Sequence, residues 1–102
     1  MMDMQNTREE LIEHLTEEAV NREVKYIHIQ IVDEDRKNLR IISGTLREVL
    51  PLLDFEYNNR FGEQELFGNI WYTDGTWSAR GVCDGVEWWE FKVCPDIPKE
   101  IK

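Results

Sequence analysis

Apolar residues near the start of the chain recur every three or four positions, and this spacing predicts an amphipathic helix over residues 7–24. Its inward stripe is expected to hold Leu11, Ile12, Leu15 and Ala19. Thr7 and Glu10 have the spacing of a capping box, which satisfies backbone N–H groups at a helix start. The rest of the helix surface is largely acidic, with Glu9, Glu10, Glu13 and Glu17. Residues 1–6 are expected to be a flexible tail.

The hydrophobic period then falls to two, which is typical of a strand with one buried face. Val24–Val32 alternates strictly and is predicted to be such a strand. Its two faces are Ile27, Ile29 and Ile31 on one side and Tyr26, His28 and Gln30 on the other. A polar segment at 33–38 leads to a second strand at 39–43, so the pair predicts a β-hairpin.

Helical spacing returns after this hairpin. Thr45 and Glu48 form a second capping-box pattern, which opens a short helix. The side chains expected to face inward are Leu46, Val49, Leu50 and Leu53. Pro51 lies too deep in the segment for a first-turn proline, so it should kink or end the helix. Residues 54–65 are predicted to be a connecting loop.

Two Asp-Gly pairs predict a three-stranded antiparallel meander near the C-terminus, because both positions of a type I′ hairpin turn need a positive φ. Two-residue loops at Asp74-Gly75 and Asp84-Gly85 would pair Trp71 with Ser78 and Cys83 with Val86. The expected core face then carries Trp71, Ser78, Val82, Trp89, Phe91 and Val93. The opposite face carries Ile70, Tyr72, Trp77, Ala79, Gly81, Trp88, Glu90 and Lys92.

These elements predict one α+β domain over residues 1–102, with 1–6 and 95–102 as flexible tails. Its parts are an N-terminal amphipathic acidic helix, a β-hairpin, a short second helix and the C-terminal antiparallel meander. The strands could form one five-stranded sheet with the helices on one face, or two separate sheets.

Charge narrows the classes of partner. The chain has 12 basic and 21 acidic residues, which gives a formal net charge of −9. Such a charge opposes direct binding to nucleic acid or to an anionic membrane, and it attracts a basic protein. No apolar run approaches the roughly 18 residues of a membrane span, and no signal peptide is evident, which predicts a cytoplasmic protein. Cys83 and Cys94 are therefore expected to be reduced thiols. The hairpin register also predicts that they do not pair, because Cys83 lies beside its turn and Cys94 lies about eight residues along the neighbouring strand.

Candidate chemistry is sparse. The two histidines, His14 and His28, have no nucleophile or metal ligand at a supporting spacing, and a solvated His14 beside Glu10, Glu17 or Glu18 is the plainer interpretation. The acidic segment at 33–38 lacks the ligand pattern of a calcium loop. We therefore expect no enzyme activity, no catalytic residues, no metal and no cofactor.

The aromatic residues Tyr72, Trp77 and Trp88 allow two interpretations. A further layer could cover them as core, because tryptophan is buried on average. Alternatively they form a contact patch, since tryptophan and tyrosine contribute large energies at interfaces.

The stretch "YTDGTWSARGVCDGVEWWEFKVCP" combines a DGTW hairpin, a second DG turn and an EWW strand before a proline. In these features the C-terminal third resembles small uncharacterised proteins that bacteriophages and prophages carry. The resemblance implies a viral or mobile-element accessory protein in the cytoplasm of a bacterial host, of a kind that often modifies the host or inhibits its defences. It implies no catalytic residues.

Two functions follow as hypotheses. The first is a non-enzymatic regulatory protein that docks on a basic host protein. The acidic helix would steer the encounter through Glu9, Glu10, Glu13 and Glu17, and Tyr72, Trp77 and Trp88 would supply affinity. Its sharpest form is an inhibitor that mimics nucleic acid in the groove of a nucleic-acid-binding protein. The second is a structural, self-assembling protein, such as a homodimer, with the aromatic sheet face as its interface.

Overall fold

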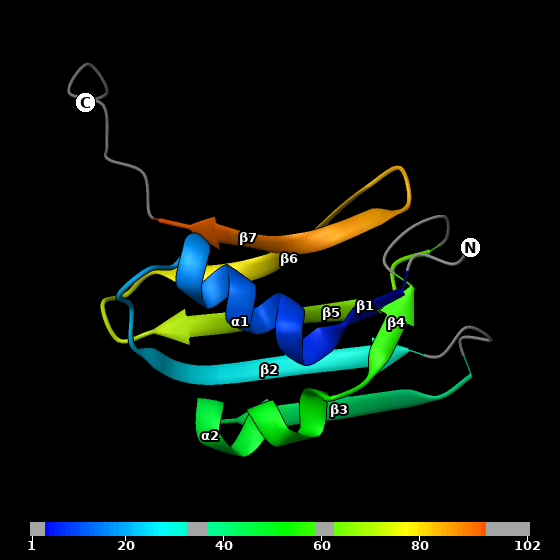
Figure 1. The fold of residues 1–102 in the computed structure, drawn as a ribbon, viewed down its shortest axis with the longest axis horizontal. Coiled ribbons are helices and arrows are strands. Elements are labelled where there is room, and N and C mark those ends of the chain that lie inside the picture. Colours follow the sequence, from blue (N-terminus) through cyan, green and yellow to red (C-terminus); the bar gives the residue numbers. More distant parts are fainter. Residues whose placement is uncertain (1–3, 33–36, 59–62, 94–102) are drawn as a thin grey trace, which may run out of the picture.

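The structure is a computed structural model that describes residues 4–32, 37–58 and 63–93 (Figure 1). It has a mixed α+β fold with a five-stranded antiparallel sheet of order β3-β2-β5-β6-β7. The strands are β2 (Val24–Val32), β3 (Leu39–Gly44), β5 (Leu66–Tyr72), β6 (Trp77–Cys83) and β7 (Val86–Lys92). The predicted β-hairpin (β2 and β3) and the predicted meander (β5, β6 and β7) thus form one sheet, joined by the pairing of β2 with β5. No helix in these described ranges is long and apolar enough to cross a membrane.

Both helices lie on one face of this sheet (Figure 1). Helix α1 (Thr7–Glu17) runs over its centre, and α2 (Leu46–Val49) continues into the 3-10 helix η1 (Leu50–Leu53) over β2 and β3. A second sheet pairs β1 (Met4–Asn6) with β4 (Glu56–Asn58). Residues 4–6 were predicted to be tail and residues 56–58 loop, and their pairing depends on a partner about 50 positions away in the sequence, which no local pattern reveals.

Helix α1 starts at Thr7, as its spacing predicts, but its N-cap differs from the predicted one and it ends sooner. Asn6, rather than Thr7, is the N-cap, and its side chain accepts from the backbone N–H of Glu9 at 3.0 Å. The predicted Thr7–Glu10 capping box is therefore wrong. The helix ends at Glu17 instead of reaching residue 24, and Asn21 adopts a left-handed φ of 63° in the turn that leads into β2.

The buried stripe of α1 is also rotated from its predicted position. Leu11 and Ala19 are fully buried as expected, but Ile12 is 40% exposed. His14 is buried in its place, which contradicts the expectation of a solvated histidine. By contrast, the Thr45–Glu48 capping box of α2 is confirmed, and the α-helix ends at Val49, before Pro51.

The first hairpin of the meander differs from its predicted register by one residue. Trp71 pairs with Trp77, and Ile70 pairs with Ser78. The one-residue shift turns the side chains of β5 to the opposite face from the one predicted. Trp71 is consequently exposed, whereas Ile70 and Tyr72 are buried on the helix face. Val82 and Val93, also expected in the core, are about half exposed.

The loop between β5 and β6 causes this shift in register. The N–H of Tyr72 donates to the carbonyl of Thr76 at 3.0 Å, so the loop has three residues instead of two. Gly75 takes a φ of 88°, as in the three-residue loops that end in a bulge. The Asp74 carboxylate accepts from the Thr76 N–H at 3.0 Å and holds this shape.

The second hairpin matches its prediction. Asp84 and Gly85 both have positive φ, at 51° and 81°, and Cys83 pairs with Val86. Cys83 is an exposed free thiol, while Cys94 and residues 95–102 lie outside the described residues.

The hydrophobic core lies between the helices and the inner face of the sheet. Its fully buried members include Leu11, Ile27, Ile29, Val49, Leu53, Leu66 and Ile70. The alternation in Val24–Val32 correctly indicates which residues of β2 face this core. The opposite face of the sheet has no helix over it among the described residues (Figure 1).

Candidate functional site

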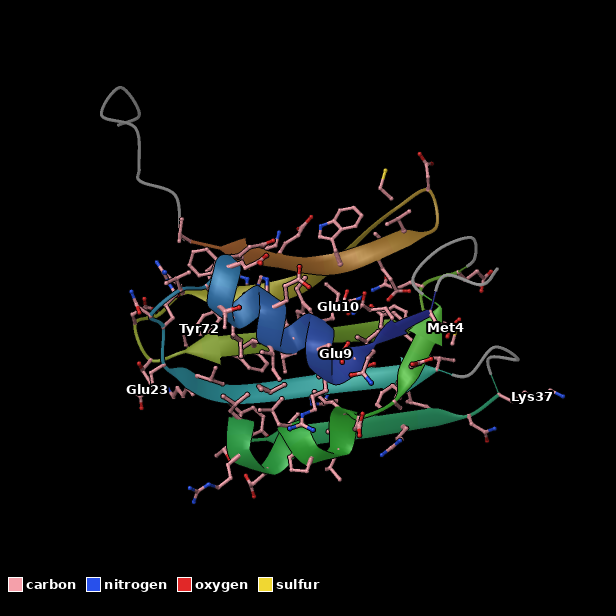
Figure 2. The ribbon with its side chains drawn as sticks, viewed as in Figure 1. Met4, Glu9, Glu10, Glu23, Lys37 and Tyr72 are labelled. Atoms are coloured by element: carbon pink, nitrogen blue, oxygen red, sulfur yellow. The ribbon has the colours of Figure 1, made fainter. Side chains whose placement is uncertain are left out.

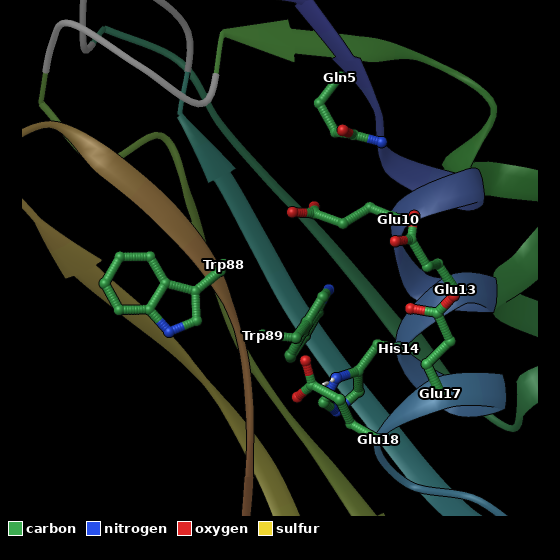
Figure 3. A pocket seen from close by; sticks show the side chains of 8 residues that line it. All are labelled: Gln5, Glu10, Glu13, His14, Glu17, Glu18, Trp88 and Trp89. Carbon is green, nitrogen blue, oxygen red and sulfur yellow. Dashed lines mark ion pairs between the residues drawn. The ribbon is translucent and has the colours of Figure 1, made fainter.

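A cleft of about 180 Å³ lies between α1 and the outermost strand, β7 (Figure 3). Its lining residues are Gln5, Glu10, Glu13, His14, Glu17, Glu18, Trp88 and Trp89. Pockets for drug-sized ligands usually have volumes of about 300–1,000 Å³. The volume of this cleft suits a single side chain or a small group.

Four carboxylates border the cleft: Glu10, Glu13 and Glu17 of α1 and Glu18, its C-cap residue. Residues three or four apart share one side of a helix, so the order of these glutamates along α1 brings them together. Glu13 and Glu17 are exposed, and no side chain among the described residues pairs with either carboxylate. The rim of the cleft thus carries negative charge that is available to a ligand.

Trp89 lies on the β7 side of the cleft, and its side chain extends towards α1 (Figure 3). Only 3% of the residue is exposed, yet its indole N–H has no hydrogen-bond partner in the described structure. The guanidinium carbon of Arg80 lies 5.1 Å from the centre of a Trp89 ring, and the His14 ring lies 6.2 Å away. A buried donor without an acceptor is costly, so this N–H favours a ligand that brings an oxygen.

Beneath the cleft, Arg80 joins the helix to the sheet. Its guanidinium donates to Glu10 at 3.1 Å, to Glu87 at 3.0 Å and to the Tyr57 hydroxyl at 2.7 Å. Glu87 also accepts the backbone N–H of Leu66 at 3.1 Å. The Arg80 and Glu87 side chains are each 1% exposed, so this pair is removed from solvent.

The shared environment changes the titration of its members. Burial raises the pKa of Glu10, and the nearby Arg80 guanidinium opposes that rise. Burial also raises the pKa of Tyr57, so its hydroxyl keeps its proton and donates to Glu10. Glu10 therefore serves the internal network, and Glu13 and Glu17 carry the more accessible charge.

His14 links the helix to β6 through a second buried line of polar atoms. Its Nε2 lies 2.7 Å from the Ser78 hydroxyl, which lies 2.6 Å from the Tyr72 hydroxyl. Its Nδ1 lies 3.2 Å from a Glu18 carboxylate oxygen. Burial lowers the pKa of His14, although Glu18 opposes the change.

The contacts from Ser78 through His14 to Glu18 thus follow the same order as the nucleophile, base and orienting acid of a catalytic triad. A nucleophile must reach a substrate atom, but Ser78 is fully buried and its oxygen already contacts Tyr72. We therefore interpret His14, Ser78 and Tyr72 as a hydrogen-bond chain that fixes α1 on the sheet.

The structure brings some of the predicted site residues together and separates others. One cleft is lined by Glu10, Glu13, Glu17 and Trp88. Glu9 is not among its lining residues. Figure 2 shows Glu9 and Glu10 as neighbours on α1, but only Glu10 takes part in the buried network. Trp77 is half-buried on the uncovered face of the sheet.

Tyr72 does not belong to an aromatic patch with Trp77 and Trp88, as the predicted register implied. It is 2% exposed on the helix face, because the three-residue loop turns β5 over. Burial raises the pKa of its hydroxyl, which the Ser78 contact partly offsets. Trp88 lies over Gly81 as expected from the second hairpin, and its indole donates to Glu90 at 2.9 Å.

Sequence reasoning missed Trp89, His14, Glu18 and Arg80 as members of this region. One signal was present: the predicted pairing of Cys83 with Val86 implies that Arg80 lies opposite Trp89, which was expected on the core face. An arginine at such a position needs buried carboxylates as partners. The two it finds, Glu10 and Glu87, lie 70 and 7 positions away in the sequence.

The uncovered face of the sheet is a second surface with apolar character. Its most exposed large residues are Leu39 (57%), Ile41 (55%), Tyr26 (44%) and Trp71 (41%). Tyr26 and Trp71 are cross-strand neighbours with ring centres 6.1 Å apart. They border a groove of about 380 Å³ near the β5–β6 loop.

No group of three or more His, Cys, Asp or Glu residues in the described ranges has the arrangement of a metal site. No family model, curated protein or solved structure matches this chain.

Proposed function

We propose that this chain is a regulatory binding protein that docks on a basic protein through the cleft between α1 and β7. The observation that carries the proposal is the pair of exposed, unpaired carboxylates, Glu13 and Glu17, on the rim of a cleft whose β7 side carries the Trp89 ring. A lysine or arginine side chain suits such a site, because carboxylates pair with its charge and aromatic faces attract cations.

Net charge supports the same partner class. At −9 the protein attracts a basic surface over a distance, and the effect weakens as salt rises. The resemblance to phage and prophage proteins makes a nucleic-acid-binding host protein the first partner class to test.

The arrangement of carboxylates favours simple docking over the mimicry of nucleic acid. Glu10 to Glu17 span about 10 Å along one helix, at about 1.5 Å per residue. They border a concave site, and Glu10 is engaged by Arg80. A mimic would require a longer row of free carboxylates on a convex surface.

The test is a pull-down from the source cell that compares three forms of the tagged protein at low and high salt. Glu13→Lys/Glu17→Lys reverses charge at the cleft, and Glu23→Lys/Glu56→Lys makes the same charge change at exposed positions that do not line it. We expect the wild type and the matched control to retain one basic protein stoichiometrically, and the cleft variant to lose it.

The basic protein that the wild-type chain retains at low salt should also dissociate from it at high salt. Equal retention by all three forms would contradict docking at the cleft. Recovery of the protein alone from every form would contradict the whole proposal.

A homodimer formed through the uncovered sheet face is the second candidate, and the exposure of Leu39, Ile41, Tyr26 and Trp71 favours it. Large exposed apolar patches mark contact surfaces. This interface would lie on the opposite face of the sheet from the helices, so both functions are compatible in one molecule.

A further inference from the structure

Strand β7 is an edge of the sheet, and among the described residues no other strand pairs with its outer side. Its pairing with β6 begins at the type I′ turn, where Cys83 lies opposite Val86. In such a turn the N–H of the fourth residue, here Val86, donates to the carbonyl of the first, here Cys83. Hydrogen-bonded and non-bonded pairs then alternate along an antiparallel ladder. The backbone groups of Glu87, Trp89 and Phe91 therefore point outward, away from β6.

The side chains of the same three residues face the helix side of the sheet. Trp89 lines the cleft, Glu87 binds Arg80, and Phe91 packs against Tyr72 with ring centres 5.9 Å apart. A strand added beside β7 would therefore place every second side chain on the side of the sheet where the cleft lies.

The unpaired indole N–H of Trp89 distinguishes between kinds of ligand. Figure 3 shows its nitrogen on the ring edge nearer α1. A bare cation could neutralise Glu13 and Glu17 but could not accept this hydrogen bond. A polypeptide carries both positive side chains and the carbonyl or hydroxyl oxygens that can accept it.

Charge decides against a second copy of the chain at this edge. Two copies paired through β7 would bring the Glu13 and Glu17 carboxylates of both into one region, with a net charge of −9 on each chain. Like charges at an interface are unfavourable, whereas a basic segment is complementary.

We propose that the cleft receives an extended basic segment of the partner, which adds to the sheet as a sixth strand along β7. Main-chain hydrogen bonds to the outward groups of Trp89 and Phe91 supply affinity, and alternate lysine or arginine side chains enter the acidic cleft. This inference rests on the proposed function and adds the conformation of the bound segment.

The test uses a capped eight-residue peptide of alternating lysine and threonine, and the same peptide with every internal backbone nitrogen methylated. Both carry equal charge, but only the first can donate main-chain hydrogen bonds along its length. Binding is measured by calorimetry at low salt, and hydrogen exchange is followed by NMR at the backbone N–H of Trp89 and Phe91 and at the Trp89 indole.

We expect the unmethylated peptide to bind at least about tenfold more tightly, which corresponds to about 1.4 kcal/mol. It should slow exchange at all three sites and lose most of its affinity for Glu13→Lys/Glu17→Lys, but not for Glu23→Lys/Glu56→Lys.

Equal binding of both peptides, lost in the cleft variant, would overturn strand addition and leave docking intact. Failure of both peptides to bind at millimolar concentration would overturn the inference, while the pull-down decides the proposed function separately. Concentration-dependent protection of Trp89 and Phe91 without peptide would overturn it in favour of a second copy.

Discussion

At the scale of single residues, burial decides what the charged side chains do. Arg80 and Glu87 are nearly inaccessible, and each depends on the other and on Glu10. Such pairs add little net stability over an apolar core, but removing one partner leaves a buried charge uncompensated. Their contribution is therefore orientation: they hold α1 against β6 and β7, and so define the cleft.

Arg80→Met should lower the free energy of unfolding by about 3–5 kcal/mol, because it leaves Glu87 and Glu10 without their cation. Urea unfolding measures the change. Arg47→Met, at an exposed position on α2, is the matched control and should change stability by less than about 0.5 kcal/mol. Neutralising both carboxylates, as in Arg80→Met/Glu10→Gln/Glu87→Gln, should recover part of the loss. A triple variant as unstable as the single one would contradict this account.

His14 should make stability depend on pH. Burial lowers its pKa in the folded protein below the ordinary value of 6.5, against the opposing effect of Glu18 and with a smaller contribution from Arg80. Below that pH the unfolded chain binds a proton that the folded protein resists, so the free energy of unfolding falls as pH falls through this range. The other groups around the ring are Ser78, Tyr72 and Trp89.

The check compares urea unfolding at about pH 7.5 and about pH 5.5, a window that brackets the ordinary histidine pKa. His14→Gln should lose less stability on acidification than the wild type, whereas His28→Gln, at a half-buried position outside this network, should behave as the wild type does. An unchanged pH dependence in His14→Gln would show that other groups cause it.

At the scale of elements, the approach of two strands depends on one glycine. Gly68 of β5 pairs with Ile29 of β2, and a Cβ at this position would lie 2.4 Å from the carbonyl oxygen of His28. A side chain there must push the strands apart, since the obstacle is backbone. Gly75 contrasts with it: its φ of 88° disfavours a side chain, but the space around it is open.

Gly68→Ala should therefore destabilise the protein by at least about 2–3 kcal/mol, as overpacking does. Gly75→Ala should cost only about 1–2 kcal/mol, from the left-handed backbone alone. Thermal and urea unfolding of the two variants give the comparison. Equal losses would mean that β2 and β5 separate easily at Gly68.

At the scale of the whole molecule, the two faces of the sheet differ in character. The helix face is closed by α1 and α2, while the other presents Leu39, Ile41 and Trp71 to solvent. Self-association through this face is opposed by the net charge of −9, which salt screens. The cleft and the uncovered face should thus respond to salt in opposite directions.

Sedimentation at rising protein concentration should show a dimer, and its dissociation constant should fall as the salt concentration rises. Ile41→Glu/Trp71→Glu should return it to a monomer, because the charges would be buried at the interface. Glu13→Lys/Glu17→Lys, at the cleft, should leave dimer formation in place. A wild type that stays monomeric up to high micromolar concentration at high salt would exclude the homodimer and leave the uncovered face to another partner.

Local patterns were sufficient to predict several elements, because their causes lie within a few residues. Strict alternation predicted β2 with its correct inward face, and the capping box and proline predicted where α2 begins and ends. The Asp84-Gly85 pair, which suits the two positive-φ positions of a type I′ turn, predicted the second hairpin and its register. The same patterns indicated the acidic side of α1, from which three of the four predicted glutamates line the cleft.

The rest was decided in one case by hydrogen bonds within a loop, which the Asp-Gly pattern did not predict, and otherwise by tertiary structure. Loop hydrogen bonds at Asp74 and Thr76 selected a three-residue turn, and that single residue moved Tyr72 into the core and Trp71 out of it. Arg80 and Glu10 are 70 positions apart, so their contact exists only once α1 packs on the sheet. The acidic surface of α1 could therefore be predicted from the sequence. Its position next to Trp89 and the unpaired edge of β7 depends on long-range packing, which no local pattern encodes.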